Sequence, residues 1–510
     1  MAVASSGSLR VVNPATLELV AAVPATEPAH VQELVAEARI AQERWAEAPL
    51  ADRADLLGRV ADLILERLDE IAGTVVSETA KPRTEAYTSE LFPALDALAW
   101  LRRAVPKLLA PQRLALRQLH LRHKRAWLVH DPLGVVGVIA PWNFPFAIPF
   151  TQAAFTVAAG NAVVVKPSEL TPLSGSLVER LFADAGAPSG LVRAAPGDGS
   201  VGEALVRAHG VAKVVFTGSA EVGRQVAAEA AGRLVPVTLE LGGKDPMLVL
   251  DDAELDRAVD GVLWGAFTNC GQVCAGVRRL YVERPLYAPF VEELARRAAA
   301  LDVGPLISEE QRARVAEVVD DALAQGARAV AGGRMPERTG WFYEPTVLVD
   351  VPPSARLERE EVFGPVVTVA AVADEREAVR RANDSSFALG ASVWTRDAAR
   401  ARRVARLLRA GCVWHNDHAY SYAAAQAPWG GRGESGFGRT HGEAGLHDLT
   451  APKLVDRDRG RVSVPWWFPY DDRGADAFRG ALRVLYGRRR VATAWAERRA
   501  LLDLARRYVP

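Results

Sequence analysis

Two patterns of hydrophobic and polar positions alternate along the chain. In residues 28–78 and again in 89–105, apolar residues recur at helical spacing, as in RADLLGRVADLILERL and SELFPALDALAWLRRAV. From residue 134 onward, short unbroken apolar runs alternate with helical segments: GVVGVIAPW, NAVVVKPSE, GLVRAAPG, KVVFTGS, PVTLELGG and PMLVLDD. Because strands that are covered on both faces read as continuous apolar runs, this alternation predicts a parallel sheet with helices on both faces.

A second series of the same kind runs from about residue 254 to 420 and predicts a second parallel sheet. The fold class is therefore α/β, with two doubly wound domains joined near residue 243. Residues 117–130, RQLHLRHKRAWLVH, loosely alternate polar and apolar positions and predict an exposed strand or hairpin. The last segment, 457–510, differs from both series: it opens with aromatic residues and prolines, and residues 477–510 carry a net charge of +7.

Composition excludes several classes of protein. The 62 basic residues equal the 62 acidic ones, which gives no bulk electrostatic reason to expect nucleic acid. No run of about 18 apolar residues exists to span a bilayer, and the first twenty residues lack the pattern of a signal peptide. Three cysteines cannot build a disulfide framework, so we expect a reducing compartment and a cytoplasmic protein.

Two of these cysteines, Cys270 and Cys274, stand together in NCGQVCAG. The spacing is CxxxC and the only other cysteine is Cys412, so no metal site is predicted. A redox pair or a small buried core residue remains open from this segment alone. Gly271 and Gly276 flank Cys274 and would let backbone approach a ligand, which favours a nucleophile if a base or a positive environment activates the thiol.

Two glycine-containing or charged turns follow apolar strands and are candidate phosphate and ribose contacts. FTGSAEVG places Gly218 and Gly223 where a helix opens, and its free N–H groups could meet a pyrophosphate; an ordinary strand-to-helix turn fits equally. KPSE places Lys166 and Glu169 at a strand's carboxyl end, where ribose hydroxyls bind in open sheets; a solvated loop is the alternative.

Two further segments carry candidate catalytic groups. PWNFP holds Asn143 between prolines, where its amide could donate to a developing oxyanion, although a structural loop is an equal alternative. LELGGKD holds Glu240 at the end of an apolar strand, where burial should raise the pKa of the carboxyl and suit it to general-base catalysis; a glutamate bonded to nearby backbone is the alternative.

Seven segments together, PWNFP, KPSE, FTGS, LELGGKD, GQVC, EEVFGP and PWGG…SGFGR, occur in the order and near the spacing of one known family. From about residue 10 to 455 the chain resembles the aldehyde dehydrogenase superfamily, of the NAD(P)-dependent and hydrolytic kind. The resemblance implies that Cys274 is the nucleophile, that Glu240 activates the deacylating water and that Asn143 holds the oxyanion; Cys270 is then a bystander.

The resemblance also assigns binding residues. It places Lys166 and Glu169 on the adenosine ribose and Glu361 on the nicotinamide ribose. Phe363 then flanks the nicotinamide, and Trp142 and Ser219 lie at the pyrophosphate and neighbouring contacts, while Gly218 and Gly223 remain candidates from their turn. It places an aldehyde tunnel among residues that are all uncharged: Phe144, Ala147, Ile148, Thr151, Thr268 and Trp429.

These residues imply an enzyme that uses NAD, because the Glu169 carboxylate should repel the 2′-phosphate of NADP. NADP remains possible. The expected substrate is an apolar aliphatic or aromatic aldehyde; alternatives are an acidic semialdehyde, or an ester hydrolysed by Cys274 without redox chemistry. Glu240 disfavours transfer of the acyl group to CoA.

By resemblance, the domains are an NAD-binding domain (1–116 and 134–242), a catalytic domain (243–440), an oligomerisation arm (117–133 and 441–456) and a tail (457–510). A homodimer or homotetramer is expected, because the unpaired backbone N–H and C=O groups of exposed strands, such as 117–130 and 446–455, can pair with another chain.

The chain departs from the family pattern in three places. Gly433 and Thr440 stand where the family usually has a lysine and a glutamate, which puts any second-carboxylate proton relay in doubt. The stretch before VGPLIS is shortened. The tail is additional, and its Arg479–Arg507 stretch reads as an amphipathic helix that packs on the protein, in preference to one on an anionic membrane.

Overall fold

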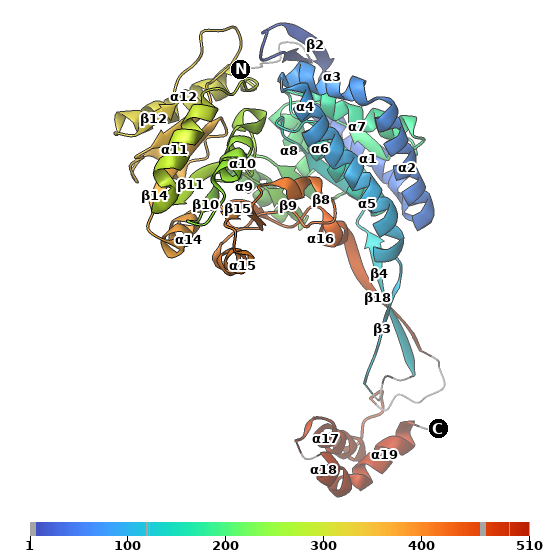
Figure 1. Cartoon of the computed structure of the whole chain (residues 1–510). Coiled ribbons are helices and arrows are strands. Elements are labelled where there is room, and N and C mark those ends of the chain that lie inside the picture. Colours follow the sequence, from blue (N-terminus) through green and yellow to red (C-terminus); the bar gives the residue numbers. More distant parts are fainter. Residues whose placement is uncertain (1–6, 119–120, 122, 459–465, 489, 509–510) are drawn as a thin grey trace. The chain divides into compact units, whose positions relative to one another are not determined.

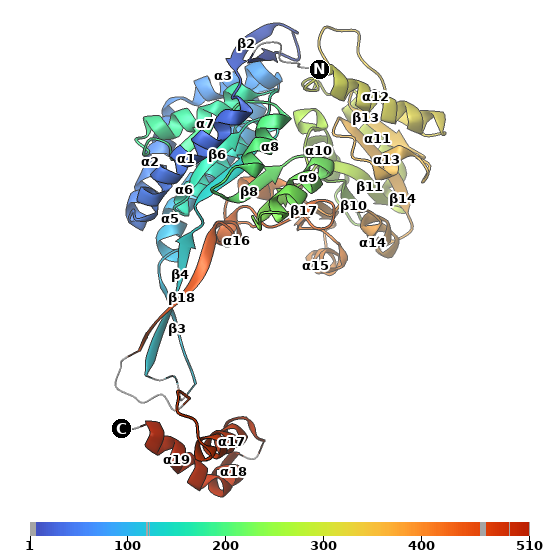
Figure 2. The ribbon, with the colours of Figure 1, turned by 180° about the vertical axis from the view of Figure 1, so that it is seen from behind.

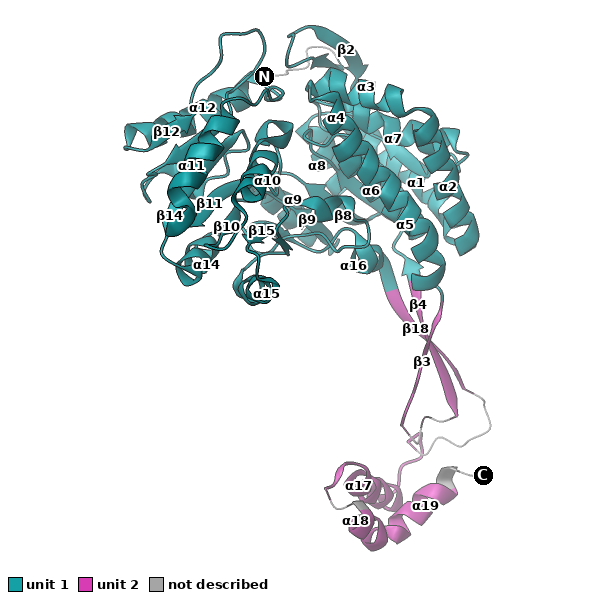
Figure 3. Ribbon diagram, in the orientation of Figure 1, with its two compact units in different colours: residues 1–110, 131–451 teal, residues 111–130, 452–510 magenta. Residues whose placement is uncertain are grey.

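A computed structural model describes residues 7–118, 121, 123–458, 466–488 and 490–508. Parts of the expected arm (119–120 and 122) and tail (459–465, 489 and 509–510) lie outside these residues, as do residues 1–6 of the expected NAD-binding domain. The chain forms two compact units (Figure 3): residues 1–110 with 131–451, and residues 111–130 with 452–510. Within the described part, no helix is long and apolar enough to cross a membrane.

The first sheet of the larger unit has six strands in the order β17-β9-β8-β5-β6-β7, of which only the β17–β9 pair is antiparallel. Its strands are β5 (Val135–Ile139), β6 (Ala162–Lys166), β7 (Val192–Ala194), β8 (Val211–Thr217), β9 (Val237–Glu240) and β17 (Gly436–Phe437). The order of β5 to β9 reverses between β5 and β8. In open parallel sheets, ligands bind at the carboxyl ends of the strands next to such a reversal.

Helices cover this sheet on both faces (Figures 1 and 2), as the unbroken apolar strands require. They are α1 (Val31–Ala46), α2 (Leu50–Glu66), α3 (Leu68–Thr79), α4 (Arg83–Glu85), α5 (Phe92–Leu108), α6 (Ala147–Ala158), α7 (Pro172–Asp184), α8 (Gly199–Arg207) and α9 (Ala220–Ala231). One buried core joins all of them except α4 to the strands. An antiparallel hairpin, β1 (Ser8–Val12) and β2 (Leu19–Pro24), precedes α1.

The second sheet has seven strands in the order β12-β13-β14-β11-β10-β15-β16, parallel except at β12–β13. They are β10 (Asp245–Val249), β11 (Val277–Glu283), β12 (Arg328–Ala331), β13 (Thr346–Val349), β14 (Val366–Val372), β15 (Gly390–Trp394) and β16 (Cys412–His415). The helices are α10 (Leu255–Phe267), α11 (Arg284–Ala298), α12 (Glu309–Ala324), α13 (Arg356–Arg359), α14 (Glu375–Asn383) and α15 (Ala398–Leu407); α16 (Gly442–His447) packs instead against the core of the first sheet. The α/β class with two parallel sheets is confirmed.

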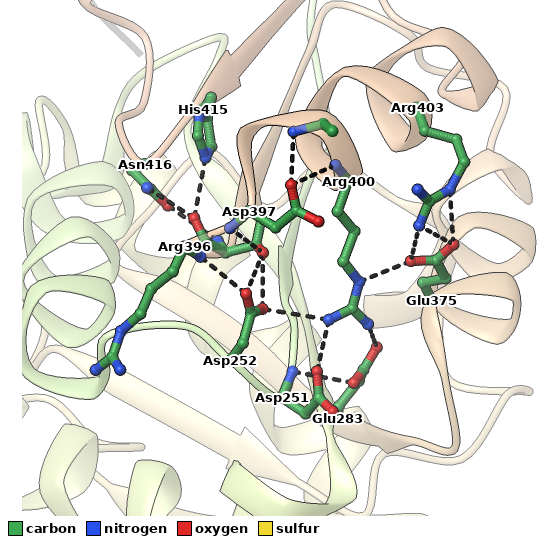
Figure 4. A network of polar contacts seen from close by, with 12 residues as sticks. Asp251, Asp252, Glu283, Glu375, Arg396, Asp397, Arg400, Arg403, His415 and Asn416 are labelled. Atoms are coloured by element: carbon green, nitrogen blue, oxygen red, sulfur yellow. Dashed lines mark hydrogen bonds and ion pairs between the residues drawn. The ribbon is translucent and has the colours of Figure 1, made fainter.

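One arginine joins helices and strands at the carboxyl edge of the second sheet (Figure 4). The Arg400 guanidinium on α15 lies within 2.5–3.2 Å of carboxylate oxygens of Asp251, Asp252, Glu283 and Glu375. These carboxylates follow β10, end β11 and open α14. Arg400 therefore fixes two surface helices to the sheet whose opposite edge carries the candidate nucleophile.

The smaller unit combines exposed strands and three helices. The strands β3 (Gln112–Leu114), β4 (Lys124–Pro132) and β18 (Thr450–Asp458) form a sheet in the order β18-β4-β3. The strand expected over 446–455 begins only at Thr450, because α16 occupies the residues up to His447. The single helix expected over 479–507 was wrong: Gly487, a residue of poor helix propensity, ends the first of three helices, α17 (Asp472–Tyr486), α18 (Arg490–Ala496) and α19 (Arg498–Tyr508).

Candidate active site

A cavity of about 240 Å³ opens where the first sheet reverses its strand order. The loop after β5 contributes Asn143, β9 ends in the cavity at Glu240, and Cys274 enters from the loop before β11. The complete lining is Pro141, Trp142, Asn143, Ile148, Thr217, Gly218, Ser219, Glu240, Leu241, Gly242, Cys274, Gln311, Arg314, Glu361 and Phe363. Three groups predicted to act together in catalysis thus share one cavity.

A buried ion pair positions the loop that carries Asn143. Lys81 Nζ donates to Glu90 Oε1 at 2.7 Å and to the Asn143 carbonyl at 2.8 Å. The other carboxylate oxygen of Glu90 accepts from the backbone N–H groups of Phe146 and Ala147, at 3.1 and 2.7 Å. Glu90 lies on a single π-helical turn, Ala86–Leu91, an irregularity that is frequent at functional sites. The pair therefore fixes the backbone on both sides of the Asn143 side chain.

Replacing one partner of this pair should destabilise the fold strongly. Both side chains are at most 1% exposed, so Lys81→Met leaves Glu90 charged and buried without its cation. We expect Lys81→Met to lower the free energy of unfolding by about 3–5 kcal/mol, measured by chemical denaturation, and Lys81→Met combined with Glu90→Gln to recover part of it. Equal losses in the single and double variants would contradict this account.

The loop that carries Cys274 is tied together by side chains that donate to its carbonyls. Arg278 donates to the carbonyls of Gly271, Val273 and Gly364, and Gln272 Nε2 donates to the Asn269 carbonyl at 3.0 Å. Asn269 and Cys270 have positive φ angles of 51° and 54°, and Gly271 one of 66°. A Cβ at residue 271 would collide with the Gly364 backbone, so only glycine fits there. These contacts hold the tight turn before Cys274.

Asn143 and the Cys274 loop contact each other directly. Asn143 Nδ2 donates to the Gln272 carbonyl at 3.0 Å, and Asn269 Nδ2 donates back to the Asn143 carbonyl at 2.9 Å. A primary amide has two N–H groups, so this geometry leaves Asn143 a second donor for a ligand in the cavity.

The thiol of Cys274 packs beside an aromatic cluster made of Trp414, Tyr422 and Trp429. The Trp429 ring centroid lies 5.2 Å from that of Tyr422 and 6.2 Å from that of Trp414. Burial raises the pKa of the Cys274 thiol, and the nearby carboxyl of Glu240 raises it further. In this state the thiol is protonated at neutral pH, and a base must remove its proton before it can act as a nucleophile.

A buried histidine orients the residue that follows Cys274. Burial lowers the pKa of His418 to about 4, so its imidazole is neutral. Its Nε2 lies 2.6 Å from the Ala275 carbonyl, which can only accept, and its Nδ1 lies 3.1 Å from Ser392 Oγ. The imidazole proton therefore lies on Nε2, which donates it to the Ala275 carbonyl. The neutral ring of His418 thus holds this part of the backbone in place.

Glu240 is buried, and neither carboxyl oxygen has a hydrogen-bond partner among the described residues. Burial raises the pKa of this carboxyl well above its usual range, and the charge of Arg439 opposes the shift only in part. Gly430 leaves room for the carboxyl, since a Cβ there would lie 2.9 Å from Glu240 Oε1. An unpartnered carboxyl in a cavity with an elevated pKa is suited to exchange a proton with a ligand or water.

Glu361 and Phe363 close the cavity from the second sheet's side. Glu361 Oε1 accepts from the Gly243 N–H at 3.1 Å, and a Cβ at Gly242 would collide with the same carboxylate. The Phe363 ring meets Trp142 edge to face, with centroids 5.4 Å apart. Phe363 has a φ of 27°, a strained value that its contacts must maintain.

A second hollow of about 750 Å³ adjoins the first and shares Pro141, Trp142, Thr217, Gly218 and Ser219 with it. Lys166 and Glu169 line this hollow, their side chains 3.1 Å apart. Apolar side chains line it as well: Ile139, Val206, Phe216, Val222 and Val226. An apolar slot, a polar pair and the opening turn of α9 fit the base, ribose and pyrophosphate of a dinucleotide.

Not every predicted residue lines these two hollows. Gly223 packs against Leu241 inside the first turn of α9, Phe144 lies under Lys81 Nζ at 4.7 Å, and Trp429 belongs to the aromatic cluster. Of the other tunnel residues, Ala147 and Thr151 are buried, and Thr268 contacts Glu85. Gly433 has a φ of 60°, and Thr440 Oγ1 lies 3.0 Å from His441 Nδ1. Both residues are uncharged, so neither supplies a charged group near Glu240.

Several site residues were not predicted from the sequence. Lys81, Glu90, Arg278 and His418 act through buried contacts to backbone far away in the chain, and no local pattern marks them. Tyr422 joins the aromatic cluster with a buried hydroxyl that has no partner among the described residues.

Comparisons with known proteins agree on one family. The model of the aldehyde dehydrogenase family matches residues 2–455. Two curated relatives, each 38% identical, are the 4,4′-diapolycopene aldehyde oxidase of a Methylomonas species (94% of this chain and 92% of that protein) and the betaine aldehyde dehydrogenase of Rhizobium etli (89% and 94%). The NAD⁺ complex of a Bacillus cereus aldehyde dehydrogenase superposes with a TM-score of 0.85 at 35% identity, covering 89% of this chain and 93% of that one. The chain therefore belongs to the aldehyde dehydrogenase family and is an oxidoreductase that acts on small-molecule aldehydes.

Proposed function

We propose that this enzyme oxidises an apolar aldehyde to the carboxylic acid with NAD, through a covalent intermediate on Cys274. The observation that carries the proposal is the convergence of Asn143, Glu240 and Cys274 on one cavity that adjoins a dinucleotide-shaped hollow. Membership of the aldehyde dehydrogenase family supports the same chemistry.

The first half of the reaction forms a bond between the Cys274 sulfur and the aldehyde carbon. The Cys274 thiol first loses its proton to solvent in the cavity, and the resulting thiolate attacks the aldehyde carbon. The carbonyl oxygen then becomes an oxyanion, which the Asn143 amide stabilises; such a donor contributes about 3–4 kcal/mol in other enzymes. A nicotinamide held beside Trp142 and Phe363 supplies the acceptor for the hydride that leaves the aldehyde carbon.

The second half of the reaction releases the acyl group from Cys274. Glu240 takes a proton from water, the resulting hydroxide adds to the thioester carbon, and the carbon–sulfur bond breaks. The products are the carboxylic acid and the free Cys274 sulfur. Dividing the oxidation into two steps lowers each barrier, which is the advantage of a covalent intermediate.

For the cofactor, we propose NAD in preference to NADP. Lys166 and Glu169 would hold the adenosine ribose, Ser219 and the opening of α9 the pyrophosphate, and Glu361 the nicotinamide ribose. The Glu169 carboxylate can accept a hydrogen bond from a free 2′-hydroxyl and repels a 2′-phosphate. The NAD⁺ bound in the Bacillus cereus relative supports this choice.

For the substrate, the aromatic cluster beside Cys274 favours an apolar chain or ring over a charged group. The cluster residues are uncharged, so a carboxylate beside them would lose its hydration without a cationic partner in the cluster itself. The relative named diapolycopene aldehyde oxidase agrees with an apolar substrate, whereas the relatives named betaine aldehyde dehydrogenase make a quaternary ammonium aldehyde the competitor to test.

Formation of reduced cofactor over a panel of aldehydes tests this function. The panel contains hexanal, decanal and benzaldehyde, with succinate semialdehyde and betaine aldehyde as the charged comparison, each with NAD⁺ and NADP⁺. We expect kcat/KM for the apolar aldehydes with NAD⁺ to exceed that for the charged ones by about tenfold or more. Preference for either charged aldehyde would contradict the substrate class, and cofactor-independent ester hydrolysis without any aldehyde oxidation would contradict the function.

We propose a homodimer or homotetramer assembled through the sheet of β3, β4 and β18. Both edge strands are exposed: all three residues of β3, and β18 from Ala451 to Arg457, with Leu114, Leu454 and Val455 among them. Unpaired edges of this kind pair with another chain unless they are protected. A monomer mass in light scattering would contradict this assembly.

A further inference from the structure

The three C-terminal helices bury small residues fully and leave many large apolar residues exposed. The side of α17 that faces its neighbours is made of Gly474, Ala477, Gly480 and Ala481, all buried. A Cβ at Gly480 would lie 2.8 Å from that of Ala500 on α19, so the two helices approach closely. Large apolar side chains are normally the most deeply buried ones, whereas here Phe478, Leu501 and Leu504 are only partly buried and others are exposed.

Several large apolar side chains of this segment are exposed, and we call them together the C-terminal apolar face. Leu482, Leu485 and Tyr486 follow helical i, i+3, i+4 spacing on α17, and Trp495 and Val491 on α18 are 73% and 87% exposed. The face also includes Leu502 on α19 and the aromatic residues before α17: Trp467, Phe468 and Tyr470. On α17 and on α18 the helical spacing places these side chains together on one side of the helix, and clustered exposed apolar side chains of this kind mark an interaction site.

Basic side chains accompany this face, both between α17 and α18 and on α19. Arg488, Arg498 and Arg499 are exposed, and the Arg498 guanidinium lies 5.0 Å from the Trp495 ring centroid. Residues 477–510 contain nine arginines and two acidic residues, one of which, Glu497, is paired with Arg483 at 2.9 Å. The segment is therefore strongly positive, although the whole chain has no net charge.

We propose that the C-terminal apolar face docks on the surface of an anionic phospholipid bilayer. Exposed Trp, Tyr and Leu side chains can enter the boundary between headgroups and acyl chains, while arginines contact lipid phosphates, the arrangement that anchors interfacial helices. The positive charge selects this occupant over a second copy of the same face, because two such segments would repel each other. The helices lie on the bilayer and do not span it.

Co-sedimentation of the full chain with lipid vesicles tests the docking, without aldehyde or cofactor. We expect pelleting with vesicles of mixed phosphatidylglycerol and phosphatidylcholine, and none with phosphatidylcholine alone. The variant Leu485→Ser/Val491→Ser/Trp495→Ser should stay in the supernatant, whereas the control Trp264→Ser, a half-exposed tryptophan of the larger unit, should pellet like the unsubstituted protein. Arg488→Glu/Arg499→Glu should weaken binding about 25-fold or more, since each basic residue near the surface contributes about fivefold.

Three outcomes would overturn the proposal. One is no pelleting with anionic vesicles at low salt, and another is equal pelleting of the triple variant. The third is a smaller oligomer for the triple variant in sedimentation velocity without lipid, which would assign the face to a second copy of the chain. Because the substituted side chains are exposed, all variants should keep the unsubstituted protein's circular dichroism and its oxidation rate with hexanal, which separates this test from that of the proposed function.

Discussion

Cys274→Ala should lose aldehyde oxidation almost completely. The proposed bond to the aldehyde carbon needs the sulfur of residue 274, and no other cysteine lines the 240 Å³ cavity among the described residues. We expect kcat to fall by about 10⁴-fold or more, as when the nucleophile of a covalent enzyme is removed. The measurement is NADH formation with hexanal and NAD⁺, and binding of NAD⁺ should remain, because the dinucleotide-shaped hollow is unchanged.

The other two cysteines provide matched controls. Cys270 packs into a separate buried cluster under α12, and Cys412 begins β16 with its thiol 3.8 Å from the Pro428 carbonyl. Neither lines the cavity, so Cys270→Ala and Cys412→Ala should oxidise hexanal at close to the unsubstituted rate. If Cys270→Ala lost activity with its fold intact while Cys274→Ala stayed active, the nucleophile would be Cys270, and the account would be contradicted.

Glu240→Gln should separate the two halves of the reaction. The amide cannot take a proton from water, so the acyl group should remain on Cys274 after one turnover. We expect steady-state kcat to fall by about 10²–10⁴-fold, the usual contribution of a general base. Rapid mixing should still show a burst of NADH, because solvent can take the thiol proton without Glu240. The control Glu434→Gln changes an exposed carboxylate that pairs with Arg224 and should leave both phases intact.

The pH profile of kcat gives a second test of Glu240. Burial raises the pKa of its carboxyl, so the ionised form that acts as a base is scarce at low pH and accumulates as the pH rises. We expect kcat to increase with pH across a range above the usual carboxyl pKa of about 4.3. Glu240→Gln should lose this rise, and a profile that keeps the same rise in the variant would assign it to a different group.

The sequence predicted the scaffold well because its signals are local. Unbroken apolar runs such as AVVVK fill strands that are buried on both faces, and the turns that follow them place Asn143, Lys166 and Ser219 at one edge of the sheet. The order of the motifs then identified the residues that meet in the cavity.

The supporting contacts could not be predicted because they join distant segments. Lys81 and Glu90 are ordinary charged residues in the sequence, and only the fold buries them against the Asn143 loop. Arg278 likewise reads as a strand residue, yet its guanidinium fills the turn before Cys274. The C-terminal segment showed a helical pattern, but its division at Gly487, with small residues inside, follows from packing among three helices.

The most direct test of the account is the mass of the acylated enzyme. Glu240→Gln is mixed with hexanal and NAD⁺, quenched in acid and digested, and the cysteine peptides are weighed. The account predicts a hexanoyl group on Cys274 in an amount equal to the NADH formed. A hexanoyl group on Cys270 or Cys412, or NADH formed with no acyl-cysteine at all, would contradict it.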